Sequence, residues 1–112
     1  MSVEQPKVID FIGVDKTSGE AILTITDHLD WNNSGDHQVV LQDKINWYLA
    51  FIESGEIFES YPDSKGRSVV IRVLFKHKPD QEGRQFLAKA KQVIEAAGFS
   101  LRHEVFAESY DN

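Results

Sequence analysis

The sequence contains no cysteine, which excludes disulfide bonds, thiolate metal sites and thiol nucleophiles. Its apolar runs are all far shorter than the roughly 20 residues that a membrane-spanning helix needs. The first residues, Met1 to Lys7, lack both the basic start and the apolar stretch of a secretory signal. From the last two absences we expect a protein of the cytoplasm.

Positive charge is also scarce. The chain has 12 Lys and Arg against 18 Asp and Glu, and its formal net charge is −6. An acidic surface repels phosphate backbones, so we expect no nucleic acid as partner. The lack of a long apolar run leads us to expect no membrane as partner. The 112 residues fit one domain, and contents of 41% apolar and 27% charged residues are typical of soluble globular proteins. We expect a single domain over 1–112, ordered at about 7–107, with tails at 1–6 and 108–112.

Alternation and periodicity of the apolar residues predict the local structure. Segments rich in β-branched and aromatic residues predict strands at 8–14, 21–26, 67–77 and 99–106. Apolar residues at three- and four-residue steps predict a helix over about 35–54, and a second helix from Pro79 and Asp80 to residue 97. Ser34 or Asp36 is expected to cap the first helix. Residues 56–66 are expected to fold back onto the body with a short helical turn.

The order of the predicted elements is β-β-α-β-α-β. The short connection at 15–19 favours an antiparallel hairpin, and the helical connections make the last three strands parallel. Right-handed crossovers place both helices on the same face of the sheet. The predicted fold is an α/β (α+β) two-layer sandwich with one mixed four-stranded sheet and two helices on one face. A spatial strand order of 1-2-3-4 is the simplest, and insertion of strand one between strands two and three is the alternative.

The predicted topology brings polar groups to one edge of the sheet, where the parallel strands end and ligands commonly bind. The candidate site residues at this edge are Asp27, His28, Asp30, His37 and His77. Imidazole and carboxylate groups suit zinc, iron or nickel, and they also suit acid–base chemistry. No standard ligand spacing supports a metal site. The structural alternative is that these residues end strands and cap a helix.

The first predicted helix carries two apolar stripes. Leu41, Ile45, Tyr48 and Ile52 form the stripe that we assign to the sheet. The second stripe consists of Val40, Trp47 and Phe51, which pack on the second helix, on the 57–61 loop or on another molecule. Because exposed apolar patches usually mark binding surfaces, this stripe is a candidate interface for a homodimer or a protein partner.

Three runs of the sequence resemble a small bacterial family catalogued only as a domain of unknown function. They are the run from Leu23 to Trp31, the run from Leu41 through Gly55, and Tyr61-Pro62 followed by Lys65-Gly66. The resemblance covers about residues 8–105. It implies a bacterial, stand-alone, cytoplasmic protein and assigns no catalytic residue.

Two functions remain open from the sequence. The first is a non-enzymatic binding or protein-interaction module without a cofactor. The alternative is a small metal-dependent or acid–base enzyme that works at the histidine and aspartate edge and requires a divalent metal or general acid–base groups. The sequence contains no Gly-rich phosphate loop and no nucleophile elbow. It therefore favours no further class of enzyme.

Overall fold

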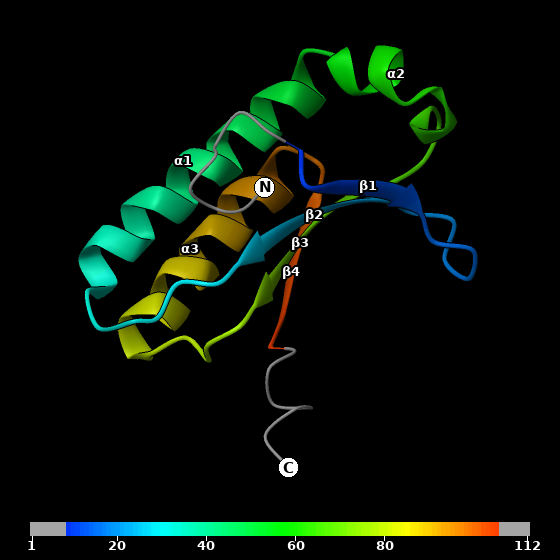
Figure 1. Cartoon of the computed structure of the whole chain (residues 1–112). Helices are drawn as coiled ribbons and strands as arrows, with labels where there is room; N and C mark the ends of the chain where they lie inside the picture. The colour runs from blue at the N-terminus through cyan, green and yellow to red at the C-terminus, as the bar shows by residue number, and fades with distance from the viewer. Residues whose placement is uncertain (1–8, 106–112) are drawn as a thin grey trace.

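The computed structural model describes residues 9–105 and contains the predicted elements in the predicted order (Figure 1). The predicted tails, and the outer ends of the first and last predicted strands, lie outside the described residues. The elements are β1 (Phe11–Val14), β2 (Ala21–Asp27), α1 (Ser34–Glu53), α2 (Glu56–Ser60), the 3-10 turn η1 (Pro62–Ser64), β3 (Val69–Phe75), α3 (Gln81–Ala96) and β4 (Ser100–Val105).

The four strands form one mixed sheet in the order β1-β2-β3-β4. β1 is antiparallel to β2, and β2, β3 and β4 are parallel. The simplest predicted strand order is therefore confirmed, and β1 is not inserted between β2 and β3. In the register, Leu23, Ile71 and Leu101 are neighbours across three strands.

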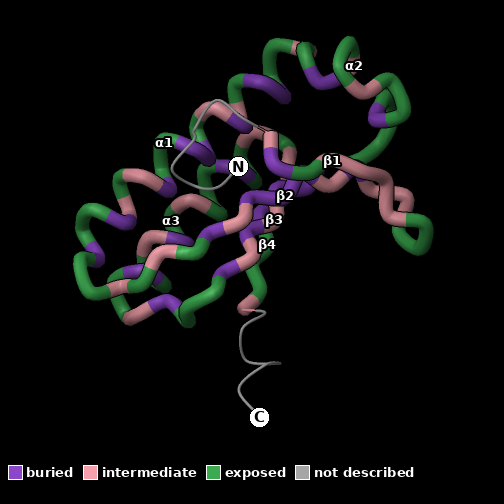
Figure 2. Tube along the Cα trace, viewed as in Figure 1, coloured by how far each residue is buried: buried purple, intermediate pink, exposed green. Residues whose placement is uncertain are grey.

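The longer helices α1 and α3 lie on one face of the sheet, which confirms the two-layer sandwich (Figure 1). Figure 2 shows buried residues along β2 and β3 and at intervals along the helices. This alternation follows from the periods of the two structures, because every second strand residue and every third or fourth helix residue points into the core. The largest fully buried apolar side chains are Tyr48, Phe75, Leu23, Ile25, Leu41, Ile57, Ile71, Ile94, Val70 and Val73.

The caps of the two long helices differ in detail from the prediction. Asn33 caps α1 by accepting a hydrogen bond from the backbone N–H of Asp36 at 3.3 Å. The predicted cap Ser34 instead donates its hydroxyl to Asp80 Oδ1 at 3.2 Å. Asp80 caps α3, so Pro79 precedes the helix and does not belong to its first turn. The two amino-terminal helix ends are thereby joined by a side-chain hydrogen bond.

The connection after α1 folds back onto the body, as predicted. It begins at Gly55, whose φ of 84° is the left-handed conformation expected after a helix. α2 then buries Ile57 completely, and η1 follows from Pro62. Within residues 9–105, no helix combines the length and the apolar character needed to cross a membrane.

Candidate functional site

The carboxyl edge of the sheet contains a buried pair of titratable side chains. Asp27 is the last residue of β2, and His37 lies in the first turn of α1. The distance between His37 Nε2 and Asp27 Oδ2 is 2.5 Å, and the two side chains are 2% and 0% exposed. The loop of six residues between β2 and α1 is short enough to bring these two predicted site residues together.

Hydrogen bonds fix the orientation of both groups. His37 Nδ1 is 2.9 Å from the carbonyl oxygen of Asp30, which can only accept, so Nδ1 carries a hydrogen. One further proton lies between His37 Nε2 and Asp27 Oδ2. The other carboxylate oxygen of Asp27 accepts from the N–H of Leu29 at 3.1 Å. Both ring nitrogens and both carboxylate oxygens therefore have partners within the fold.

Trp31 covers this pair. Its ring stacks on the imidazole of His37, with centroids 3.7 Å apart, and its Nε1–H donates to the carbonyl oxygen of His77 at 3.1 Å. The ring also lies against α3, because a Cβ atom added at Gly83 would be 2.8 Å from Trp31 Cζ3. Trp31 thus joins the loop after β2 to the loop after β3 and to the first turn of α3.

Of the other predicted site residues, Asp30 contacts His37 through its backbone carbonyl only, as described above. His28, Asp30 and His77 are exposed. The carboxylate of Asp30 accepts from the N–H of Asn32 at 3.0 Å, and His77 contributes its backbone carbonyl to the edge. In the part of the chain that the structure describes, no group of three histidine or carboxylate side chains is placed to hold a metal ion. The metal site stays a prediction.

The fourth histidine, His103, lies on β4 beside the ring of Phe75, with centroids 5.9 Å apart. It is a neighbour of Val73 in the sheet and faces the helices, not the loops of the carboxyl edge. Burial lowers the pKa of His103, and the positive charge of Lys91 lowers it further.

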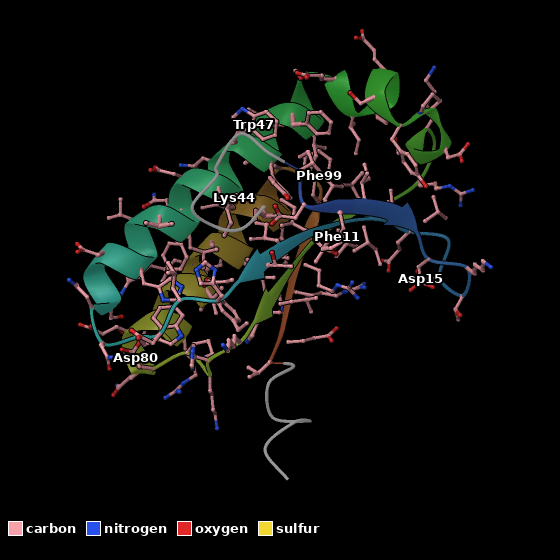
Figure 3. All side chains as sticks on the ribbon, in the orientation of Figure 1. Phe11, Asp15, Lys44, Trp47, Asp80 and Phe99 are labelled. Atoms are coloured by element: carbon pink, nitrogen blue, oxygen red, sulfur yellow. The ribbon has the colours of Figure 1, made fainter. Side chains whose placement is uncertain are left out.

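A second buried polar cluster was not predicted. The Nζ of Lys44, in the middle of α1 (Figure 3), is 3.2 Å from Asp10 Oδ1, and both side chains are 0% exposed. The other carboxylate oxygen of Asp10 accepts from the N–H of Thr26 at 3.0 Å and from its hydroxyl at 3.3 Å. Lys44 is the only lysine, arginine or acidic residue among the buried residues of α1 in 34–53. A lysine at this position of an apolar stripe is the feature of the sequence from which a buried ion pair could have been predicted.

Tyr48 completes this cluster. Its hydroxyl oxygen accepts from the N–H of Asp10 at 2.9 Å, and its O–H donates to the carbonyl oxygen of Thr24 at 3.1 Å. Burial raises the pKa of Tyr48, and the nearby charge of Asp10 raises it further. The phenol therefore stays neutral and holds α1 to β2 and to the chain before β1.

A groove of about 470 Å³ runs between α1 and α3 on the helical face. Its rim is polar and contains one acidic and one basic residue, Glu82 and Lys89. Its apolar lining comes from both helices and consists of Ile45, Leu49, Phe86, Ala90, Val93 and Ile94. Ile45 and Ile94 are buried, whereas Val93 is 60% exposed.

Residues 1–107 match the family of unknown function DUF6572. The chain belongs to this family. The match agrees with the resemblance seen in the sequence and gives no reaction, ligand or partner. No curated protein and no solved structure shows significant similarity to the chain.

In this member of the family, the predicted interface stripe is largely part of the core. Phe51 is only 6% exposed, and the ring of Trp47 stacks on it with centroids 5.6 Å apart. Val40 and Trp47 are half-buried and pack against the core. The expected exposed surface is therefore absent at Phe51, because the helix turns this side chain inward. An interface at Val40 and Trp47 stays a prediction.

Proposed function

We propose that this protein is a non-enzymatic protein-interaction module that binds a second copy of itself through the groove between α1 and α3. The observation that carries the proposal is the groove itself, in which Leu49, Phe86 and Ala90 are half-buried and Val93 is 60% exposed. Helical grooves with an apolar floor and a polar rim are common sites for a helix of another chain. A helix laid into this groove would remove these apolar side chains from water.

The charges of the groove favour a second copy as the occupant. The chain has a net charge of −6, but the groove lining holds one acidic and one basic side chain. Glu82 and Lys89 are about two helical turns apart on α3. A symmetric pair needs a self-complementary surface. When two copies of α3 run antiparallel, Glu82 of each copy faces the Lys89 region of the other, so opposite charges meet.

The carboxyl edge offers less support for catalysis. A general base or metal ligand needs a free lone pair on a side chain that a substrate can reach. His37 uses both ring nitrogens within the fold, and Trp31 covers one face of its ring. An enzyme of the alternative class that used His37 would have to break one of these hydrogen bonds, whereas the side chains of His28 and His77 are exposed. Titration with zinc or nickel tests this alternative, and stoichiometric binding that is lost in His28→Ala would favour it.

The proposal keeps the setting expected from the sequence, which is the cytoplasm of a bacterium. A module of this kind needs neither a cofactor nor a nucleic acid. Its binding surface would be the helical face, and the half-buried Val40 and Trp47 would then serve mainly as packing for α1.

Sedimentation velocity over a wide range of protein concentrations tests the proposal. We expect a reversible monomer–dimer equilibrium that Val93→Glu abolishes, because the new charge would be buried in the dimer. Val39→Glu is the matched control, since Val39 is a helical valine with 57% exposure that does not line the groove. Both variants should keep the circular dichroism of the wild type.

Two outcomes would overturn this assignment. A wild-type protein that stays monomeric at the highest concentration does not pair with itself. A dimer that survives Val93→Glu but not Val39→Glu uses another face of the molecule.

A further inference from the structure

The face of the sheet opposite α1 and α3 carries a polar centre. Side chains alternate along a strand, so Arg72 points away from the core that its neighbours Ile71 and Val73 enter. The register places Thr24, Arg72 and Arg102 side by side on β2, β3 and β4. Two arginines are thus adjacent on the face that neither α1 nor α3 covers (Figure 1).

A hollow of about 380 Å³ lies on this face, next to Arg72. Gly13 contributes no side chain between Phe11 and Asp15, which both line the hollow. A Cβ atom added at Gly13 would meet nothing within 4 Å. Phe11 is 58% exposed, and Ile22 also lines the hollow. Phe11 and Ile22 therefore give the hollow an apolar wall, to which Asp15 adds one carboxylate at the rim.

The two arginines are bonded differently. Arg102 makes two hydrogen bonds with the carboxylate of Glu20, at 2.9 and 2.8 Å. Arg72 donates from one terminal nitrogen to Thr24 Oγ1 at 3.2 Å, and its Nε is buried without a partner among the described residues. A buried N–H without an acceptor is rare in folded proteins because it loses its bond to water. The Nε–H itself is buried, so the part of the half-buried Arg72 that can face the hollow is its terminal guanidinium nitrogens.

We propose that the hollow binds a small organic carboxylate, whose two oxygens accept from Arg72 and whose apolar part lies against Phe11 and Ile22. The planar guanidinium presents the N–H groups of its two terminal nitrogens side by side, and this fork matches the two oxygens of a carboxylate. This binding is independent of self-association through the helical groove, which lies on the other side of the sheet.

The charge of the site favours an anion with one negative charge. Asp15 lies at the rim of the hollow. Hydrogen bonds from the backbone N–H groups of Thr17 and Ser18 lower the pKa of Asp15, so its carboxyl group is ionised at neutral pH. One arginine faced by this fixed negative charge suits a monocarboxylate better than a doubly charged phosphate.

The test is a nuclear magnetic resonance titration with benzoate, a carboxylate attached to an apolar ring. We expect saturable shifts of the amides of β1 and β2 and of the Arg72 Nε–H signal. Benzyl alcohol, which keeps the ring without the charge, and inorganic phosphate, which keeps the charge without the ring, should both bind more weakly. Equal binding of benzyl alcohol or phosphate would overturn the proposed ligand class.

Matched variants locate the site. Arg72→Gln should weaken benzoate binding about tenfold or more, because a charge-assisted pair of hydrogen bonds is lost. Arg102→Gln is the control, since it removes the same charge from the adjacent strand position, where Glu20 already occupies the guanidinium. It should leave the affinity nearly unchanged. Equal losses in the two variants would show only a general effect of charge and would refute the assigned contact.

Gly13→Val gives a second, independent readout. The backbone of Gly13 does not have a positive φ, and open space surrounds its Cα, so the valine should be accommodated without strain. The new side chain would fill the hollow and abolish benzoate binding while Arg72 stays in place. Unchanged binding in Gly13→Val would overturn the proposed location even if Arg72→Gln were unfolded.

Discussion

The close contact between Gly83 and Trp31 at the carboxyl edge predicts how the protein responds to a larger side chain at position 83. Gly83 lies in the first turn of α3, and a Cβ atom there would be 2.8 and 2.9 Å from Trp31 Cζ3 and Cη2. Both distances are too short for carbon atoms, whose contacts are optimal at about 3.5–4.0 Å. Gly83→Ala must therefore displace either the indole ring or the start of the helix.

Two opposing effects set the magnitude. Alanine is favoured over glycine in a helix by about 0.8–1.0 kcal/mol. Overpacking of a tight contact costs about 1–3 kcal/mol. We expect Gly83→Ala to lower the free energy of unfolding by up to about 2 kcal/mol. In a Trp31→Phe background the shorter ring lacks the clashing atoms, so the same change should be neutral or stabilising by up to about 1 kcal/mol.

Urea denaturation of the wild type, the two single variants and the double variant measures this coupling. We expect an interaction energy of about 1–3 kcal/mol between the two positions, within the range for residues in direct contact. If Gly83→Ala changes the stability equally in both backgrounds, then the indole ring does not lie on Gly83. The packing of Trp31 against α3 would then be wrong.

Three further predictions concern the core and the titratable groups. Ile71→Ala should lower the free energy of unfolding by about 2–5 kcal/mol, because the side chain is fully buried in a central strand, and a loss below about 1 kcal/mol in a denaturant titration would contradict this burial. Asp27→Ala should lower the free energy of unfolding by about 3–5 kcal/mol, since it leaves His37 Nε2 and the N–H of Leu29 without partners. Asp27→Asn should lower it by less than about 1.5 kcal/mol, because the amide keeps both hydrogen bonds. Equal losses would show that these hydrogen bonds contribute little. The pKa of His103 should lie below its ordinary value of 6.5 in a proton NMR titration, and a midpoint at or above 6.5 would contradict the partial desolvation of the ring and the effect of Lys91. Because the unfolded chain then binds the proton more readily, the contribution of His103 to stability should rise with pH up to about 6.5 and stay constant above it.

The fold followed from patterns that act locally. Alternation of apolar and polar residues predicted the strands, and apolar residues at three- and four-residue steps predicted the helices. Short connections left few possible strand orders. The errors occur where a distant contact decides between neighbouring residues. Asn33 caps α1 because Ser34 is bonded to Asp80, which is 46 positions away in the sequence. No local signal distinguishes two adjacent capping residues that suit the same role.

The candidate site was predictable only in part, for the same reason. Asp27 and His37 end a strand and begin a helix that meet at one edge, so topology alone brings them together. The positions of His28 and His77 depend on loop conformations that the residue types do not determine. The hollow beside Arg72 depends on a missing side chain on β1 and an unpaired nitrogen on β3, and such a combination exists only after the strands have aligned.

The two buried polar pairs, His37 with Asp27 and Lys44 with Asp10, have a consequence for how α1 can move over the sheet. His37 and Lys44 lie two helical turns apart on the sheet-facing side of α1, and each is held by an aspartate from a different part of the sheet layer. A slide of α1 by one turn, about 5.4 Å, would separate both pairs at once. For the charges of Lys44 and Asp10, the loss of the partner would cost about 3–5 kcal/mol. The two polar pairs therefore fix the position of α1 along the sheet more strictly than apolar contacts, which have no direction, would do.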